Sequence, residues 1–258
     1  MAPVFAEERR QLILSHVREA GKATVEELAQ RFDVSLPTIR ADLGRLESQG
    51  LLRRTHGGAL PVESTLYEAP YRVRAQAYLT EKRSVAEVCA SLVSDDETVL
   101  LDAGTTTFEI AVRLKRRQGL KLVTNSLSIA WEMMDHPSIG VILLGGQVTP
   151  DRRATLGDLV LHTLAEIRVD ISFVSFNGVH AEAGYTSVDF DAASIKRSMM
   201  DRARQVVVAA DHSKLGQVAF ARVGPVESGH ILVVDAGARH ELLEPFHRRG
   251  VDVRIAPL

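Results

Sequence analysis

Seven short apolar runs follow one another along the last two-thirds of the chain, and they constrain its fold more than any other feature of the sequence. The runs lie at residues 97–102, 120–124, 139–144, 170–176, 205–210, 230–235 and 251–256. Helical patterns separate most of them, for example at residues 106–114 and 192–203. Such alternation is typical of a parallel, doubly wound sheet with helices on both faces. We therefore predict an α/β domain over residues 79–258.

A smaller domain of short helices is predicted ahead of the sheet, in residues 1–60. Apolar residues at helical spacing indicate a first helix. Thr24, with Glu27 three places later, forms a capping box that opens a second helix, and Ser35 can cap a third. Residues 61–78 are interpreted as a linker between the two domains.

The third of these helices is predicted to have two different faces. Its apolar face, at about 100° per residue, consists of Leu36, Ile39, Leu43 and Leu46. The opposite face has small residues and a guanidinium, so its backbone can approach a DNA major groove about 12 Å wide. A hairpin over residues 51–60 would form a wing whose arginines contact phosphate. The predicted DNA-binding residues are Ser35, Thr38, Arg40, Ala41, Arg45, Arg53, Arg54, His56 and Gly57.

The net charge of the whole chain does not indicate a nucleic-acid partner. The chain has 31 basic and 33 acidic residues, a formal charge of -2. Within residues 36–60, however, four arginines are opposed by Asp42 and Glu47 only, a local charge of +2. This patch favours DNA binding, although the same helical spacing also fits a three-helix module that contacts protein.

Polar residues follow several of the predicted strands, at the edge where open parallel sheets bind ligands. They are Asp102, Gly104, Thr105 and Thr106, then Thr124, Asn125 and Ser126, then Gly145 and Gly146, then Asn177 and Gly178, and finally Lys214. Each group could be an ordinary turn or cap, but their recurrence favours a polar, anion-tolerant site suited to a phosphorylated polyol. Asp189 and Asp191 either cap a helix or reach the ligand, and Lys196 nearby is a further candidate. Because there is no Walker A or GxGxxG motif, a nucleotide is not implied.

Many of these residues belong to two sequence motifs, one in each predicted domain, whose residues occur at fixed spacings. The N-terminal set is Val25-Glu26-Glu27-Leu28-Ala29, Val34-Ser35-x-x-Thr38-Ile39-Arg40-x-Asp42-Leu43 and Leu46-x-x-x-Gly50-Leu51-Leu52-x-Arg54-x-His56-Gly57-Gly58-Ala59. The C-terminal set is Glu81-Lys82, Asp102-x-Gly104-Thr105-Thr106, Thr124-Asn125-Ser126, Gly145-Gly146, Gly178 and Asp211-x-Ser213-Lys214. Over nearly the whole chain, the two sets resemble the DeoR family of bacterial transcription regulators. The chain departs from the family at Ala41, where an arginine is common.

The resemblance implies a winged helix-turn-helix joined to a sensor domain similar in fold to ribose-5-phosphate isomerase. It implies a repressor of a sugar-catabolism operon that binds double-stranded operator DNA and is released by a phosphorylated sugar or a related metabolite. The family and the symmetry of operators imply a homodimer or homotetramer. Carried over by position, the resemblance implies that Gly104, Thr105 and Thr106 hold the phosphate. It also implies that Asn125 and Ser126 contact sugar hydroxyls or phosphate, and that Lys214 pairs with the ligand's negative charge.

A sugar-phosphate isomerase-like enzyme with an appended DNA-binding module is the alternative. Isomerisation needs a general base beside the carbon that loses its proton. The loop at residues 176–180 lacks the carboxylates usual in such an enzyme, although Asp102 and His180 remain possible bases. We therefore expect binding without turnover, and no enzyme activity.

The remaining features argue against several other classes of protein. The nine histidines and the lone Cys89 show no HExxH or CxxC spacing, so neither a metal nor a cofactor is expected. The longest uncharged stretch, residues 136–150, is interrupted by glycines and prolines and does not suit a membrane helix of about twenty residues. Charges precede any apolar signal segment, so a cytoplasmic protein is expected. Trp131, Met133 and Met134 are expected to pack in the core or in an interface.

Overall fold

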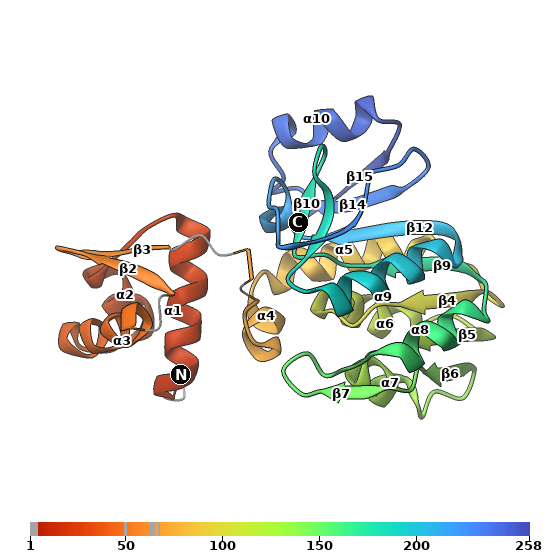
Figure 1. Cartoon of the computed structure of the whole chain (residues 1–258), viewed down its shortest axis with the longest axis horizontal. Helices are drawn as coiled ribbons and strands as arrows, with labels where there is room; N and C mark the ends of the chain where they lie inside the picture. Colours follow the sequence, from red (N-terminus) through yellow and green to blue (C-terminus); the bar gives the residue numbers. More distant parts are fainter. Residues whose placement is uncertain (1–4, 49–50, 62–64, 67) are drawn as a thin grey trace. The chain divides into compact units, whose positions relative to one another are not determined.

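The structure is a computed structural model that describes residues 5–48, 51–61, 65–66 and 68–258, apart from the side chain of Glu19. The described chain divides into two compact units, Met1–Ser64 and Thr65–Leu258, each with its own buried apolar residues. Figure 1 labels many of the helices and strands of both.

The N-terminal unit has the three predicted helices and a small antiparallel sheet. Its elements are α1 (Ala6–Ala20), β1 (Ala23–Thr24), α2 (Val25–Phe32), α3 (Leu36–Ser48), β2 (Leu52–Thr55) and β3 (Gly58–Pro61). The capping box of α2 is confirmed, because the Glu27 N–H donates to Thr24 Oγ1 (3.2 Å) and the Thr24 N–H donates to Glu27 Oε2 (2.8 Å). Local sequence signals therefore determine where these helices begin.

The buried face of α3 differs in part from the prediction. Ile39, Leu43 and Leu46 are buried as expected, but Leu36 is 37% exposed because it is the first residue of the helix. The prediction that Leu36 lies in the core is wrong. Asp42 is buried on this face instead, with 4% of its surface exposed.

The predicted hairpin is confirmed, with a tight turn. Strand β2 pairs with β3 from Leu52 opposite Pro61 to Thr55 opposite Gly58, which leaves His56 and Gly57 as the turn. Strand β1 pairs with the other edge of β3. A methyl group on Gly58 would lie 2.1 Å from the carbonyl oxygen of Ala23, so this close pairing requires glycine.

In the C-terminal unit, as far as the structure describes it, all seven predicted runs form one parallel sheet (Figure 1). The strands are β4 (Thr98–Leu101), β5 (Leu120–Thr124), β6 (Ile139–Leu143), β9 (Val169–Val174), β12 (Ala203–Ala210), β14 (Ile231–Asp235) and β15 (Asp252–Ala256). Their order across the sheet is β15-β14-β12-β9-β4-β5-β6. The predicted α/β fold class, with its parallel sheet, is confirmed.

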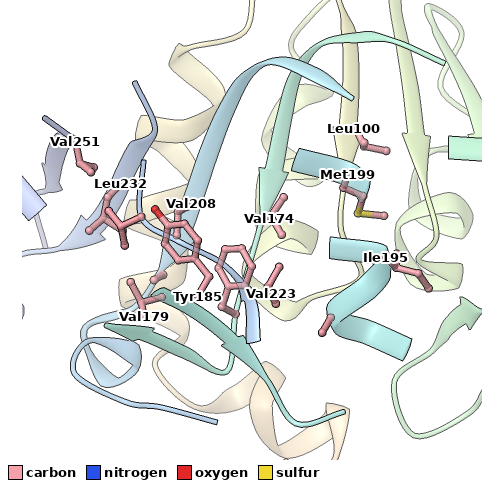
Figure 2. Packing of buried hydrophobic residues seen from close by; sticks show 14 of the residues in the cluster. Leu100, Val174, Val179, Tyr185, Ile195, Met199, Val208, Val223, Leu232 and Val251 are labelled. Atoms are coloured by element: carbon pink, nitrogen blue, oxygen red, sulfur yellow. The ribbon is translucent and has the colours of Figure 1, made fainter. Parts of the chain in front are cut away.

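Both faces of this sheet are covered, and alternate residues of a strand enter different cores. The helices of this unit are α4 (Tyr71–Gln76), α5 (Leu79–Ser91), α6 (Thr105–Leu114), α7 (Leu127–Met133), α8 (Asp158–Ala165), α9 (Phe190–Asp201) and α10 (His240–Arg248), with a 3-10 turn η1 (His212–Lys214). Val99 and Leu101 of β4 belong to a core shared with α5, α6 and α7, whereas Leu100 belongs to a core shared with α8, α9 and α10. Figure 2 shows part of the second core, where Tyr185 lies among Val179, Val208 and Leu232.

Several shorter strands lie outside the main sheet and were not predicted. They are β7 (Gln147–Thr149) and β8 (Ala154–Leu156), which pair with each other, and β10 (Gly178–His180), β11 (Gly184–Ser187) and β13 (Ala221–Gly224), which form a second antiparallel sheet.

The three large apolar residues at the end of α7 differ in burial. Met133 is buried, but Trp131 is 77% exposed and Met134, just after the helix, is 58% exposed. Trp131 and Met134 are therefore not core residues of this chain, and their packing in an interface stays a prediction.

Candidate functional site

The predicted DNA-binding residues share one property, which is access to solvent. Arg40, Ala41 and Arg45 are exposed on α3, while Arg53, Arg54, His56 and Gly57 are exposed on the hairpin. Ser35 precedes α3, and its Oγ accepts a hydrogen bond from the Thr38 N–H (3.3 Å) and lies 2.8 Å from Thr38 Oγ1. The Ser35 hydroxyl therefore caps the N-terminus of α3, and this is the end at which recognition helices generally meet base edges.

Arg54 joins the hairpin to α3. Its backbone N–H donates to Glu47 Oε1 (2.9 Å), and its guanidinium lies 4.0 Å from Glu47 Oε2. The same guanidinium covers Gly44, where a methyl group would lie 3.6 Å from Nη1. Arg40 and Arg53, by contrast, make no ion pair within the part of the chain that the structure describes. The hairpin is thus held against the helix while arginines on both elements stay available to an anionic partner.

Asp42 anchors α3 to α1 rather than facing solvent. Its carboxylate accepts a hydrogen bond from Arg9 Nε (2.6 Å) and lies 3.3 Å from Arg10 Nη1, and all three side chains are almost fully buried. In the local charge of +2 for residues 36–60, Asp42 offsets one of the four arginines. Since α1 neutralises this carboxylate internally, the exposed face is more positive than the local charge of +2 predicted.

In the C-terminal unit, Asp102 is the centre of a buried polar cluster. It follows β4, and its Oδ2 accepts hydrogen bonds from the Ser175 N–H (3.3 Å) and Oγ–H (3.1 Å) beyond the end of β9. Lys196 of α9 is ion-paired with the same oxygen and also donates to the Ser175 carbonyl (2.7 Å). The cluster therefore brings together two predicted site residues that are far apart in the sequence.

Asn125 joins three segments at the same edge of the sheet. Its Oδ1 accepts the Ala103 N–H (3.0 Å) and its Nδ2 donates to the Thr155 carbonyl (3.0 Å). The neighbouring hydroxyls serve the fold, because Thr124 donates to the Leu101 carbonyl (2.7 Å) and Ser126 caps α7 by accepting the Ile129 N–H (3.2 Å). Asp189 likewise caps α9 by accepting the Ala192 N–H (2.8 Å), which confirms the capping interpretation of that residue.

The start of α6 packs closely against the end of β9. A methyl group on Gly104 would lie 2.3 Å from Ser175 Oγ, so glycine permits this approach. Thr105 and Thr106 are 8% and 5% exposed, and the structure gives their hydroxyls no hydrogen bond among the described residues. These two hydroxyls, together with the first N–H groups of α6, remain candidates for an anionic ligand.

A small cavity of about 30 Å³ brings together four of the predicted effector-binding residues, Asp102, Asn125, Asn177 and Lys196. It is also lined by charged residues that sequence reasoning missed, Glu68, Arg74 and Arg152. No local pattern marks these three, because each stands in a loop or a short helix where charged residues are ordinarily solvated. Their partners come from distant segments.

Glu68 is the most enclosed of the missed residues. Its carboxylate lies 3.2 Å from Arg74 Nη1 and 3.1 Å from Arg152 Nε, and it accepts a hydrogen bond from Asn177 Nδ2 (3.1 Å). Burial raises the pKa of this carboxyl, but the two guanidinium groups and the amide outweigh burial and hold the pKa below its ordinary value. Arg152 is also ion-paired with Asp189.

The other predicted effector residues do not line this cavity. Gly146, which follows Gly145 in the chain, has φ 152° and packs closely against the Leu156 carbonyl. Gly178 packs closely against the Gln217 carbonyl. Lys214 lies close to Asp211, because its backbone N–H donates to the Asp211 carbonyl (3.0 Å). Burial raises the pKa of the Asp211 carboxyl, but the charges of Lys214 and Lys82 outweigh burial and hold the pKa below its ordinary value. Gly145, Gly146, Gly178 and Lys214 are therefore not among the residues that line this cavity, and their effector roles stay predictions.

Two further features bear on other classes of function. No helix within the described ranges is long and apolar enough to cross a membrane. The same ranges contain no group of three or more His, Cys, Asp or Glu side chains placed to hold a metal ion. Cys89 is buried, which raises the pKa of its thiol.

Comparisons with known proteins match both units. A family model described as "DeoR-like helix-turn-helix domain" matches residues 9–65, and one described as "DeoR C terminal sensor domain" matches residues 78–236. The chain is 32% identical to the HTH-type transcriptional regulator GolR of Listeria innocua, over 98% of this chain and 100% of the relative. It is 30% identical to a putative aga operon transcriptional repressor of Escherichia coli, over 95% and 92% of the two chains.

Two more proteins are similar to this chain over a smaller share of its length. A glycerol-3-phosphate regulon repressor of Escherichia coli is 29% identical over 89% of this chain and 90% of the relative. Among solved structures, a ribose 5-phosphate isomerase from Methanocaldococcus jannaschii covers 54% of this chain and 55% of its own, at 19% identity and a TM-score of 0.40. This structural likeness is too low to carry a functional conclusion.

Proposed function

Because the chain belongs to the DeoR family of DNA-binding transcription regulators, we propose that it represses a sugar-catabolism operon and leaves its operator when a phosphorylated sugar or a related metabolite binds the C-terminal unit. The observation that carries the proposal is the presence of two sites in one chain. An arginine-rich recognition surface lies in the N-terminal unit, and a buried polar cavity with cationic side chains lies in the C-terminal unit.

The proposed DNA contacts follow from the exposed side chains of α3 and the hairpin. Arg40 and Arg45, which are exposed, would contact base edges, since a guanidinium binds guanine through two hydrogen bonds. Arg53 on the hairpin would contact phosphate, which contributes affinity that depends on salt but not on base sequence. Ala41, where the family commonly has an arginine, allows close approach of the helix but supplies no charge of its own.

The proposed effector class follows from the chemistry of the cavity. Lys196, Arg74 and Arg152 offer positive charge, whereas Asn125 and Asn177 offer amide groups that can hydrogen-bond hydroxyls. A phosphorylated polyol combines an anion with several hydroxyls. The names of two similar proteins, repressors of the aga operon and of the glycerol-3-phosphate regulon, support the same chemical class.

Binding without turnover is the better proposal for this site. Asp102, one possible general base, already accepts hydrogen bonds from Ser175 and is ion-paired with Lys196. His180, the other, uses Nδ1 to accept the N–H groups of Glu182 and Ala183 (both 3.2 Å) in its own hairpin. Neither group is therefore ready to take a proton from a sugar.

We further propose that the protein acts as a homodimer or homotetramer in the cytoplasm, where operator DNA is found. Two recognition helices related by symmetry would contact half-sites about one DNA turn apart or a multiple of it. Effector binding would favour an arrangement that fits those half-sites less well, with a coupling of about 1–3 kcal/mol.

The test is a titration of the operator complex with phosphorylated and free sugars. Fluorescence anisotropy of labelled operator DNA should fall when one of the sugar phosphates is added and should not respond to the same sugar without phosphate. Thr105→Val should bind operator normally but resist release. Thr163→Val, the same change at an exposed threonine of α8 that does not line the cavity, serves as the control. Tighter operator binding on addition of the sugar phosphate would contradict the proposed mechanism of induction.

A further inference from the structure

The first residues of the C-terminal unit close its small polar cavity. Residues 65, 66 and 68–70, which we name the strap, are attached at both ends. The Phe220 N–H donates to the Thr65 carbonyl (3.0 Å), and Arg74 Nε donates to the Ala69 carbonyl (2.9 Å). In the sequence, the strap directly follows the DNA-binding unit. Any change in its position therefore moves the first residues of the C-terminal unit.

The Glu68 carboxylate of the strap has the surroundings of a bound anion. Two guanidinium groups, of Arg74 and Arg152, lie within 3.2 Å of its oxygens, and the Asn177 amide donates a third contact at 3.1 Å. Guanidinium groups can form charge-assisted hydrogen bonds to the oxygens of a carboxylate or of a phosphate. The side chains of Glu68, Arg74 and Arg152 are only 17%, 19% and 19% exposed, so water screens these ion pairs little.

Glu68 also stands between the small cavity and a larger one. The small cavity holds about 30 Å³, which is about the share of one water molecule, whereas the neighbouring cavity holds about 510 Å³. Both are lined by Glu68, Arg152 and Leu156. Pockets for small ligands generally measure about 300–1,000 Å³. The small cavity alone is thus too small for a phosphorylated sugar, and movement of Glu68 would join it to the larger one.

We propose that Arg74, Arg152 and Asn177 form an anion subsite that Glu68 occupies in the absence of effector, and that the phosphate of the effector displaces this carboxylate and releases the strap. The inference rests on the proposed function, because it names where that effector's anionic group binds. A phosphate dianion carries more charge than a carboxylate and has three acceptor oxygens, so it satisfies the same donors. Displacement converts ligand binding into movement of the segment next to the DNA-binding unit.

The first test compares phosphate affinity in variants of the full chain without DNA. Inorganic phosphate is the probe, and isothermal titration calorimetry measures its binding. Glu68→Gln keeps the shape of the strap side chain but removes the competing charge, so phosphate should bind about tenfold tighter or more, within the ~5- to 150-fold range of typical couplings. Adding Arg152→Gln to this variant should abolish the gain.

Glu109→Gln is the matched control. Glu109 is 13% exposed and, like Glu68, has two arginine partners, Arg113 at 2.9 Å and Arg83 at 3.5 Å, but it lines neither cavity. Its phosphate affinity should equal that of the wild type. The proposal is overturned if folded Glu68→Gln binds phosphate no tighter than the wild type, if Glu109→Gln gains equally, or if the gain survives Arg152→Gln.

A second measurement uses the wild type alone and does not depend on how the variants fold. Hydrogen exchange of the peptide that contains Glu68 should become faster when phosphate is added, whereas an ordinary ligand slows exchange around its site. Slower or unchanged exchange in that peptide at saturating phosphate would overturn the proposal.

Both measurements omit DNA, so they are separable from the test of the proposed function. If Glu68→Gln gains affinity but no sugar phosphate releases the wild type from its operator, the subsite stands and the repressor mechanism fails. If a sugar phosphate releases the wild type but Glu68→Gln binds phosphate as the wild type does, the mechanism stands and the displacement of Glu68 is refuted.

Discussion

Replacing Asp42 by asparagine should destabilise the N-terminal unit by about 3 kcal/mol. The Asp42 side chain is 5% exposed and contacts Arg9 at 2.6 Å and Arg10 at 3.3 Å, whose side chains are 11% and 10% exposed. Removing one partner of a buried ion pair generally costs about 3–5 kcal/mol, because the other charge stays buried without its counter-ion. Arg10 keeps its ion pair with Glu7, so the lower end of this range applies.

Hydrogen exchange of the α3 amides in the full chain measures this change directly. Since each 1.36 kcal/mol is a factor of ten, exchange through global opening of the unit should become roughly 150-fold faster in Asp42→Asn. A domain of this size is stable by only a few kcal/mol, so operator binding at elevated temperature should weaken as well.

Glu47→Gln is the control for the loss of one carboxylate from α3. Glu47 is 43% exposed and lies 4.0 Å from the Arg54 guanidinium, so its ion pair contributes less than about 1 kcal/mol. If Asp42→Asn accelerates exchange no more than Glu47→Gln does, the argument that burial makes the Asp42 contacts important is refuted.

Three other perturbations have expected outcomes. Arg40→Ala should weaken operator binding by about 1–3 kcal/mol in anisotropy titrations, whereas Arg53→Ala should mainly make the salt dependence less steep, and unchanged behaviour of both would remove this surface from the interface. Gly104→Ala should lower the Tm of the C-terminal unit, because the added methyl would lie 2.3 Å from Ser175 Oγ, and an unchanged Tm would show that this contact relaxes freely. Glu68 has a pKa below its ordinary 4.5, so it stabilises the folded state fully above pH 4.5 and loses this effect as the pH falls through the lowered pKa. The Tm advantage of the wild type over Glu68→Gln should therefore shrink on acidification, and an advantage that is constant with pH would contradict the sign of this shift.

The sequence patterns succeeded where a single segment contains the whole signal. The strands of the main sheet, such as β12 and β14, are continuous apolar runs because both of their faces are buried. The capping box of Thr24 and Glu27 involves neighbours only. The short strands β10, β11 and β13 were missed because three or four residues show no clear alternation, and they pair only through contacts between distant segments.

The candidate effector site was predictable in part for a similar reason. Asp102 and Asn125 follow apolar runs, and the carboxyl ends of adjacent parallel strands meet at one edge of a sheet. Lys196 was a candidate from its neighbourhood, but its pairing with Asp102 depends on how α9 packs on the sheet. Lys214, which follows β12, was predicted by the same reasoning, but its backbone N–H bonds the Asp211 carbonyl and it does not line the cavity.

The sequence by itself therefore determined the family, the α/β class, the helices and hairpin of the N-terminal unit, and the edge of the sheet where polar residues gather. Only the tertiary structure decided which charges are buried and with what partners. Asp42 becomes an anchor because α1 packs two arginines against it, and Glu68 becomes enclosed because Arg152 and Asn177 come from segments more than eighty residues away. A local sequence pattern predicts that a charged residue is solvated. The partner that makes burial of the charge favourable comes from a distant segment and is brought close only when the chain folds.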